Sequence, residues 1–251
     1  MRQRLSPAQL TAPFVMTVLG LAILISLGTW QMHRKVWKED LMAAIAQRSS
    51  APPADFLSAV TATRKQGDDA IGLEYLRVKV RGRFDHSKER YFYAPDPSRG
   101  PGYNVTTPLE IAGSPVIVFV NRGFVPETLK DPASRASGQT TAGVDVVGLI
   151  RESGHPGRFT PDNNPAQNMW YWRDVTALKA SAYPDGKATV MPFIIDQEAF
   201  DAAGDGPKGG ATIVSLTNRH LEYAITWYGL ALTLAAIFAA YAMTRLRATK
   251  A

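Results

Sequence analysis

The sequence contains no cysteine among its 251 residues. This absence excludes disulfides, thiolate metal sites, iron–sulfur clusters and cysteine nucleophiles, and it leaves open whether the compartment is oxidising. Common enzyme signatures are also absent: there is no G-x-S-x-G, H-E-x-x-H or P-loop motif, and no G-x-G-x-x-G follows a strand-like run. The four histidines, His33, His86, His155 and His220, lie far apart without metal-ligand spacing. We therefore predict that the protein is not an enzyme.

Acidic residues are fewer than basic ones, which leaves a formal net charge of +6. A positive charge can indicate nucleic acid binding, but much of the excess flanks two apolar runs. The flanking basic residues are Arg2, Arg4, Arg34, Lys35, Lys38, Arg245, Arg247 and Lys250. Lys and Arg beside a membrane span set its orientation and contact anionic lipid. We therefore predict membrane lipid as a partner and no nucleic acid.

The two apolar runs, Ala12–Trp30 and Ile225–Met243, contain no charged residue. At about 1.5 Å per residue, a helix over either run is about 28 Å long, close to the ~30 Å hydrocarbon core of a bilayer. Trp30 closes the first run and Trp227 lies near the start of the second, as interfacial aromatic residues do. The sequence therefore predicts transmembrane helices over 12–30 and 225–243.

A cleaved signal peptide is the alternative for the first run. That run is too long for one, and His33-Arg34-Lys35 follows where a cleavage site would stand. The eleven residues before it are few for a mitochondrial presequence, which favours a bacterial inner membrane. Basic residues in the short tails, 1–11 and 244–251, predict that both tails are cytoplasmic, although the cluster after the first run argues the opposite way. We predict a multi-pass protein whose central domain, 31–224, is periplasmic.

The central domain is predicted to be rich in β-strands. A helical continuation over 31–48 ends at Pro52-Pro53, and from Leu76 to Val80 apolar residues alternate with basic ones. Further strand-like runs are Tyr91–Ala94, Val116–Asn121, Val144–Ile150, Phe193–Asp196 and Thr212–Leu216. A short helix is predicted at Asp174–Ala182, with Asp174 as its N-cap. The fold class is a membrane protein in which two transmembrane α-helices bracket a mainly antiparallel, barrel-like α+β domain.

Six segments, in this order, resemble the Surfeit-locus-one family of cytochrome oxidase assembly proteins. They are Gly28–Gln31 with Arg34 and Trp37-Lys38, Arg81–His86, Asn121–Pro126, Val147–Arg151, Asn163–Asp174 and Asn218–Leu232. The resemblance runs from about residue 20 to 245. The sequence departs from the family at Phe124, where Trp is common, and at His155–Phe159, where a basic-Pro-Phe run is common. We expect both departures to be surface or turn substitutions.

The resemblance implies an accessory protein that assists the biogenesis of haem-copper oxidases. It implies haem a as a transient cofactor, which some bacterial members bind and help to deliver. It also implies oxidase subunit I, haem a synthase and other assembly factors as partners. The alternative is a scaffold without haem that stabilises an assembling oxidase subunit.

His220 is the predicted haem iron ligand, since imidazole is a usual axial ligand and the residue matches the family's histidine before the second span. If the helix begins near Asn218, then His220, Tyr223 and Trp227 share one face with two alanines. The alternative is that His220, Tyr223 and Trp227 only anchor the helix at the interface.

The end of the first span is the predicted second wall of the haem site, because Trp30, Arg34 and Trp37 share a helix face. Arg34, Lys38 or Arg219 are candidates to pair with haem propionates, and contact with lipid headgroups is the alternative. Gly28 is expected to let the two helices approach closely. The runs Asn121–Gly123 and Asn163–Pro165 are predicted to hold turns, with contact to a partner as the alternative.

Overall fold

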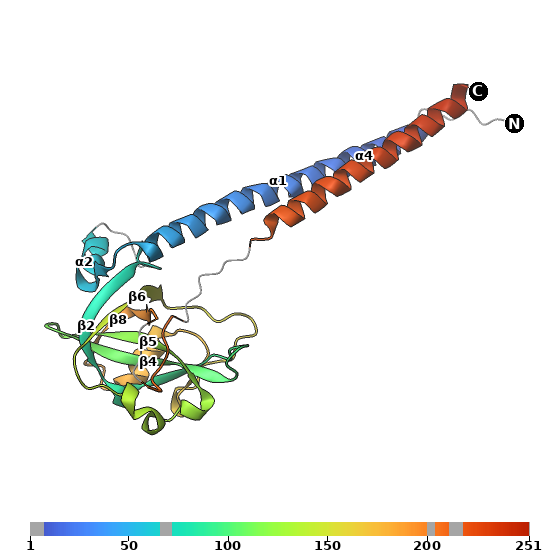
Figure 1. Cartoon of the computed structure of the whole chain (residues 1–251). Helices are drawn as coiled ribbons and strands as arrows, with labels where there is room; N and C mark the ends of the chain where they lie inside the picture. The colour runs from blue at the N-terminus through green and yellow to red at the C-terminus, as the bar shows by residue number, and fades with distance from the viewer. Residues whose placement is uncertain (1–7, 66–71, 200–203, 211–217, 251) are drawn as a thin grey trace. The chain divides into compact units, whose positions relative to one another are not determined.

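The computed structural model describes residues 8–65, 72–199, 204–210 and 218–250 (Figure 1). The chain divides into two compact units. The helical unit comprises residues 1–44 and 215–251, and the barrel unit comprises residues 45–214. The predicted strand Thr212–Leu216 lies outside the described residues.

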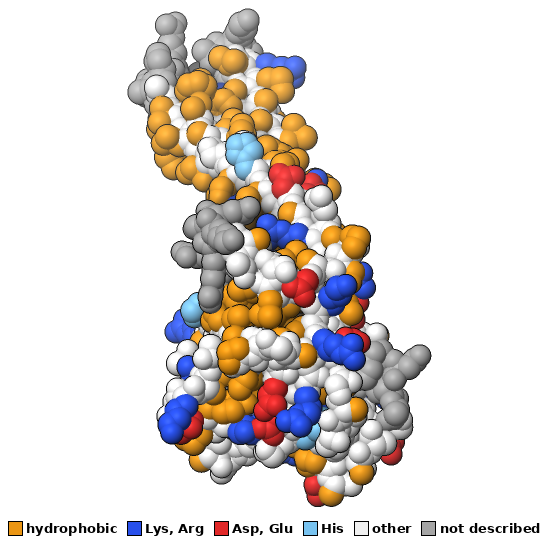
Figure 2. Space-filling view, turned by 90° about the vertical axis from the view of Figure 1, so that its left-hand side faces the viewer, with side chains coloured by type: hydrophobic (Ala, Val, Ile, Leu, Met, Phe, Trp, Pro, Cys, Tyr) orange, Lys and Arg blue, Asp and Glu red, His pale blue; other side chains and the backbone are white. Residues whose placement is uncertain are grey.

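Two long helices, α1 (Ala8–Ser50) and α4 (His220–Lys250), contain the predicted spans. Both are long and apolar enough to cross a membrane, and their most apolar stretches are 0% and 11% buried, unlike the core helix of a soluble domain. Figure 2 shows hydrophobic side chains over these helices. Helix α1 continues through the predicted extension, and the two prolines follow its end. These observations support the predicted membrane protein.

The two helices pack antiparallel at positions where small residues face large ones. A Cβ atom added to Gly28 would lie 2.7 Å from the ring of Tyr228, and one added to Gly20 would lie 2.9 Å from Leu234. The hydroxyls of Thr29 and Tyr228 are 3.2 Å apart. The predicted close approach at Gly28 is therefore confirmed.

The described residues of the barrel unit form eight strands and several short helices. The strands are β1 (Ala54–Asp55), β2 (Arg77–Phe84), β3 (Arg90–Tyr93), β4 (Gly102–Ile111), β5 (Val116–Pro126), β6 (Val144–Glu152), β7 (Met169–Trp170) and β8 (Thr189–Gln197). The helices are α2 (Phe56–Lys65), α3 (Val175–Ala182) and the 3-10 turns η2 (His86–Lys88), η3 (Glu127–Leu129), η4 (Pro132–Gly138) and η5 (Pro165–Gln167).

One sheet, in the order β1-β2-β6-β8-β5-β4-β3-β7, contains all eight strands. An additional pairing of β2 with β4 closes β2, β6, β8, β5 and β4 into a five-stranded barrel. The pairs β1–β2, β3–β7 and β5–β8 are parallel, and the other pairs are antiparallel. The predicted mainly antiparallel, barrel-like domain is confirmed.

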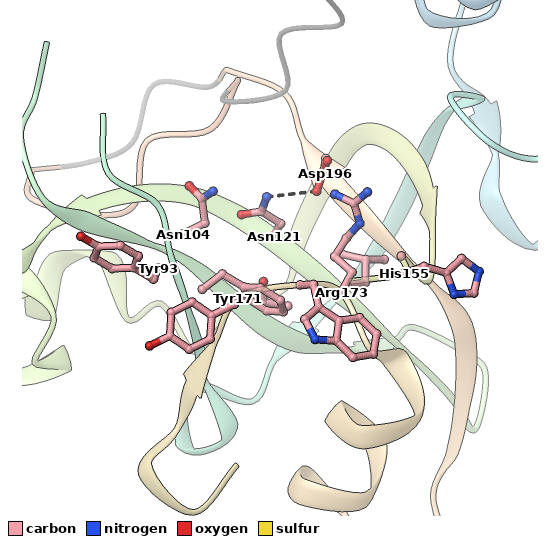
Figure 3. Close-up of a pocket in the computed structure, with 12 residues that line it drawn as sticks. Tyr93, Asn104, Asn121, His155, Tyr171, Arg173 and Asp196 are labelled. Atoms are coloured by element: carbon pink, nitrogen blue, oxygen red, sulfur yellow. Dashed lines mark hydrogen bonds between the residues drawn. The ribbon is translucent and has the colours of Figure 1, made fainter. Parts of the chain in front are cut away.

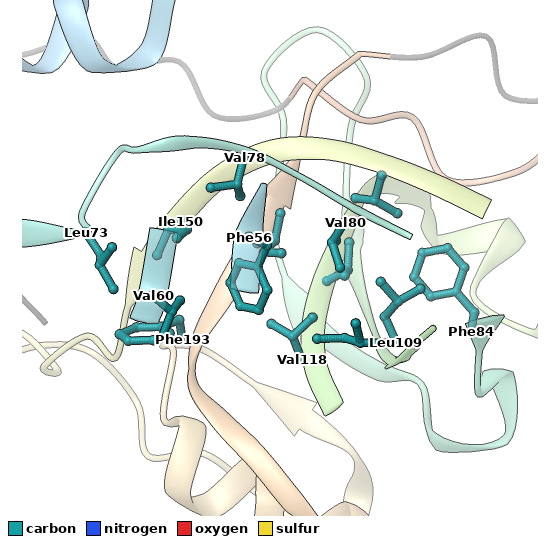
Figure 4. Packing of buried hydrophobic residues seen from close by; sticks show 14 residues of the cluster. Phe56, Val60, Leu73, Val78, Val80, Phe84, Leu109, Val118, Ile150 and Phe193 are labelled. Atoms are coloured by element: carbon teal, nitrogen blue, oxygen red, sulfur yellow. The ribbon is translucent and has the colours of Figure 1, made fainter. Parts of the chain in front are cut away.

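The interior of the barrel is filled by alternate residues of its strands, because successive side chains of a strand point to opposite faces. Val78 and Val80 of β2 and Val118 of β5 belong to this core, and Phe56 and Val60 of α2 pack into it (Figure 4). Burying each such side chain contributes about 1.5–3 kcal/mol. The neighbouring odd-numbered residues of β2 and β5 therefore point to the outer face of the barrel.

A second apolar cluster lies on the outer face of β5 and β8. Phe119 and Ile194 pack there against the fully buried Trp170 and against helix α3. The carboxylate of Asp174 accepts a hydrogen bond of 2.9 Å from the backbone N–H of Ala177, so the predicted α3 helix and its N-cap are confirmed. This cluster fixes the segment that follows Trp170 against the barrel.

Candidate functional site

The predicted haem ligand, His220, is the first residue of α4. Its ring Nδ1 lies 2.7 Å from the side-chain Oε1 of Gln31 on α1. Asn218 accepts a hydrogen bond from the backbone N–H of His220 and donates one to the carbonyl of Lys35. The start of α4 thus contacts α1 through two residues, Asn218 and His220, and the ring of His220 has Gln31 as a defined neighbour.

The other predicted site residues lie around this contact. Trp30 is 54% exposed and Tyr223 is 52% exposed, whereas Trp227 is half-buried. The guanidinium of Arg34 lies 4.3 Å from the centre of the Trp37 ring, so these two side chains share a face of α1. The structure brings His220 together with Gln31, and it leaves Trp30 and Tyr223 open to the surroundings. Their role as walls of a haem site stays a prediction.

The sequence analysis did not predict a role for Gln31 in the site. It stands in one of the segments that carry the family resemblance, but its side chain alone predicts no chemistry. Its partner is 189 positions away in the sequence, so only the antiparallel pairing of α1 with α4 shows the contact. A usable signal was its position beside Trp30, at the polar end of the first apolar run.

A buried ionic cluster lies in the barrel unit around Glu89, whose side chain is 2% exposed. Arg135, which is fully buried, donates to both carboxylate oxygens. Tyr91 and Gln139 donate at 3.2 Å each, and Arg122 lies at 3.5 Å. Burial alone would raise the pKa of Glu89, but the hydrogen bonds and positive charge lower it to about 2. The carboxylate is therefore ionised and fully paired at neutral pH.

His86 closes one side of this cluster. Its Nε2 lies 2.8 Å from the carbonyl oxygen of Thr140, so Nε2 carries a proton. Its Nδ1 lies 3.2 Å from Glu89 and 3.3 Å from Arg122, so it accepts from Arg122 when neutral and donates to Glu89 when protonated. Burial lowers the pKa of Arg122 to about 10. Both ring nitrogens of His86 and both carboxylate oxygens of Glu89 therefore have partners within the cluster or on the adjoining backbone.

The cluster predicts loss of stability in acid. The folded pKa of Glu89 lies below its ordinary value of 4.5, so its contribution is complete above about pH 4.5 and disappears as the pH falls towards about 2. We expect the difference in unfolding free energy between the wild type and Glu89→Gln to shrink across this window. Urea titrations of both proteins at pH 2–6 measure that difference. A pH-independent difference would contradict the assignment.

A cavity of about 320 Å³ lies on the outer face of the barrel, above the second apolar cluster (Figure 3). It is lined by Phe92, Tyr93, Asn104, Thr106, Asn121, Gly154, His155, Tyr171, Trp172, Arg173, Ile194 and Asp196. Figure 3 shows amides and charged groups along one side and aromatic rings along the other. The Nδ2 of Asn121 donates to Asp196 at 3.0 Å, and Arg151 donates to the other oxygen of Asp196 at 3.1 Å.

The loop from Asn163 to Trp172 shapes the aromatic wall of the cavity. The side chain of Asn163 accepts from the backbone N–H of Tyr171 and donates to the carbonyl of Trp172. Asn164 caps the 3-10 turn η5 through a bond to the N–H of Gln167. The prediction that Asn163–Pro165 holds a turn is confirmed, and that turn positions two cavity residues.

The prediction that Asn121–Gly123 holds a turn is wrong, because these residues lie inside β5. The register of β5 on β4 shifts there: Val105 pairs with Gly123 and Thr106 pairs with Asn121. Arg122 is the extra residue of this β-bulge, and bulges redirect side chains. The bulge turns Asn121 to the cavity and Arg122 to the Glu89 cluster.

Phe124 was expected to be a surface or turn substitution, and that expectation is also wrong. Its side chain is buried, and a Cβ atom added to Gly102 would lie 2.4 Å from its ring. The guanidinium of Arg99 lies 4.3 Å from the ring centre. The other departure, His155–Phe159, lies in an exposed loop as expected.

Comparison with known proteins places this arrangement in a family. The model of the SURF1 family matches residues 18–232, which include most of α1, the barrel unit and the start of α4. The chain belongs to the SURF1 family. Surfeit locus protein 1 of Mus musculus is 39% identical over 223 residues, covering 83% of this chain and 69% of that protein. The Homo sapiens protein of the same name is 38% identical over 219 residues, covering 81% and 69%.

A third relative is also similar over most of its length. The SURF1-like protein of Monosiga brevicollis is 36% identical over 225 residues, covering 85% of this chain and 81% of that protein. The family match includes Gln31, Glu89 and His220 within its bounds. The resemblance found from six short segments is thereby confirmed over most of the chain.

Proposed function

We propose that this protein is an assembly factor for a haem-copper cytochrome c oxidase, which binds haem a through His220 and assists its insertion into oxidase subunit I. Membership of the SURF1 family supports the assembly role. The contact of His220 with Gln31 supports the haem role, and it is the observation on which the proposal depends most. Haem a synthase and other assembly factors are the further partners that the proposal includes.

The residues present fit a haem ligand at this position. Within the described residues, the ring Nε2 of His220 has no hydrogen-bond partner, so its lone pair can bind iron. A bound haem a would supply an iron that takes an imidazole as axial ligand. The exposed Trp30, Tyr223 and Arg34 offer aromatic faces and a cation to a flat molecule with propionate groups.

The proposed location is a bacterial inner membrane, with residues 31–224 in the periplasm and both tails in the cytoplasm. The apolar surface of α1 and α4 supports membrane insertion. The orientation depends on the basic residues of the short tails. In that orientation, His220 and Gln31 lie at the periplasmic ends of the two spans.

A second candidate function is the scaffold without haem. The cavity on the barrel favours it, because tyrosine, tryptophan and arginine dominate binding hot spots in protein interfaces. Tyr93, Tyr171, Trp172 and Arg173 give the cavity this composition. In the scaffold function, the cavity would bind a segment of an assembling oxidase subunit, and His220 would only anchor α4.

Replacement of His220 by alanine tests the haem role. We expect wild-type protein purified from cells that make haem a to show a haem spectrum. We expect His220→Ala to retain less haem, by a factor of roughly ten or more. His33→Ala is the matched control, since His33 is an exposed histidine on α1. A wild type without haem, or a His220→Ala spectrum equal to wild type, contradicts haem ligation. Equal recovery of oxidase subunits with both proteins supports the scaffold function.

A further inference from the structure

We propose that Gln31 is a positioning residue that fixes the tautomer and orientation of His220, so that Nε2 is presented as the free ligand atom. This inference rests on the proposed function, because it concerns the same histidine. Gln31 itself would not touch the iron.

The geometry of the contact determines which nitrogen carries the proton. The two atoms that face each other at 2.7 Å are Nδ1 of His220 and Oε1 of Gln31. An amide oxygen only accepts hydrogen bonds, so the proton between them belongs to Nδ1. A neutral imidazole has one protonated nitrogen, and Nε2 therefore keeps its lone pair.

The surrounding contacts hold both partners in place. Asn218 binds the backbone of His220 and the carbonyl of Lys35, which fixes the start of α4 on α1. About two turns further along α4, Tyr228 packs against Gly28, which limits how far the helices can separate. The side chains of Gln31 and His220 are both half-buried, so the hydrogen bond is shielded while the ring remains accessible.

This arrangement is the one that histidine ligands of metals require. Such a ligand almost always donates its second ring N–H to an oxygen, which fixes the ring and raises its basicity. Here the oxygen comes from the other helix, so ligand orientation depends on the pairing of α1 with α4. A hydrogen bond that only held the two helices together would form with either tautomer of His220.

The first test uses the full-length protein without haem. The ring nitrogens of 15N-histidine-labelled protein are observed by NMR, with His220 assigned by its loss in His220→Ala. We expect the wild type and Gln31→Glu, which keeps an oxygen acceptor, to carry the proton on Nδ1. Gln31→Leu should lose this signature, and Gln47→Leu, at an exposed glutamine of α1, should not. A wild type protonated on Nε2, or an unchanged Gln31→Leu, overturns the proposal.

The second test measures haem retained by the same variants made in cells that produce haem a. Gln31→Leu should retain haem with roughly 10- to 100-fold lower affinity, and Gln31→Glu should remain near the wild type. Thr29→Val removes the hydroxyl contact between the helices without touching His220 and should have no such effect. If Thr29→Val and Gln31→Leu lost haem to the same extent, the positioning role would be wrong, and Gln31 would only hold the two helices together. A wild type without haem contradicts the proposed function, while the NMR result still decides the tautomer.

Discussion

Replacing Glu89 with leucine should lower the free energy of unfolding of the barrel unit by about 3–5 kcal/mol. The substitution removes the carboxylate that pairs with Arg135, which is 0% exposed, and that neutralises Arg122, which is 5% exposed. An arginine does not lose its charge at neutral pH, so two cations would remain buried with one counter-ion missing. Urea unfolding of the full-length protein, followed by tryptophan fluorescence, measures the change.

The protein is destabilised because buried positive charge is left without its counter-ion, and not because a strongly favourable ion pair is lost. Ion pairs taken out of water gain little net energy over an apolar replacement, but an unpaired buried charge costs several kcal/mol. Replacing Glu89 and Arg135 together by leucine should therefore recover part of the loss. If the double variant were less stable than Glu89→Leu by as much as Arg135→Leu alone destabilises the wild type, this reasoning would be contradicted.

The matched control is Glu110→Ala. Glu110 pairs with Arg83 at 3.2 Å, and both side chains are largely exposed. Exposed pairs contribute about 0–1 kcal/mol, because water screens both charges in the folded state. If Glu110→Ala and Glu89→Leu destabilised the protein equally, burial of the cluster would not be the cause.

The parts of the fold that could be predicted from the sequence are those with a local signal. The two spans are continuous apolar runs, β2 alternates every second residue, and Asp174 marks the start of α3. Strand β4 was missed, since most of its residues are buried on both faces and its polar Thr106 and Thr107 interrupt any alternation. A strand covered on its inner face by the barrel and on its outer face by loops has no period of two to detect.

The candidate sites show the same limit. His220 could be singled out because an imidazole beside a membrane span already indicates chemistry. Gln31 and Glu89 act through partners far away in the sequence, at separations of 189 residues for His220 and 46 for Arg135. The cavity collects side chains from four strands and two loops. Such sites depend on strand order and register, which the pattern of one sequence does not specify.

Replacing Gly123 with alanine should destabilise the barrel unit by about 2–5 kcal/mol. The backbone of Gly123 has φ of +110°, which costs an L-residue with a Cβ atom about 1–2 kcal/mol. The added Cβ would also lie 1.9 Å from the carbonyl oxygen of Lys208, a backbone atom that cannot rotate away. Forcing such a contact apart costs about 1–3 kcal/mol more. Urea unfolding against the wild type measures the sum.

Gly113→Ala separates the two contributions. Gly113 has φ of +73°, but an added Cβ would meet no atom within 4 Å, so only the conformational cost of about 1–2 kcal/mol should appear. The close contact at Gly123 predicts a second difference, because Phe124 and Lys208 exchange backbone hydrogen bonds of 3.0 Å in both directions. Gly123→Ala should therefore speed hydrogen exchange at the amides of Phe124 and Lys208, and Gly113→Ala should leave both protected. Equal exchange in the two variants would mean that backbone conformation, and not the approach of residues 204–210 to β5, requires glycine at position 123.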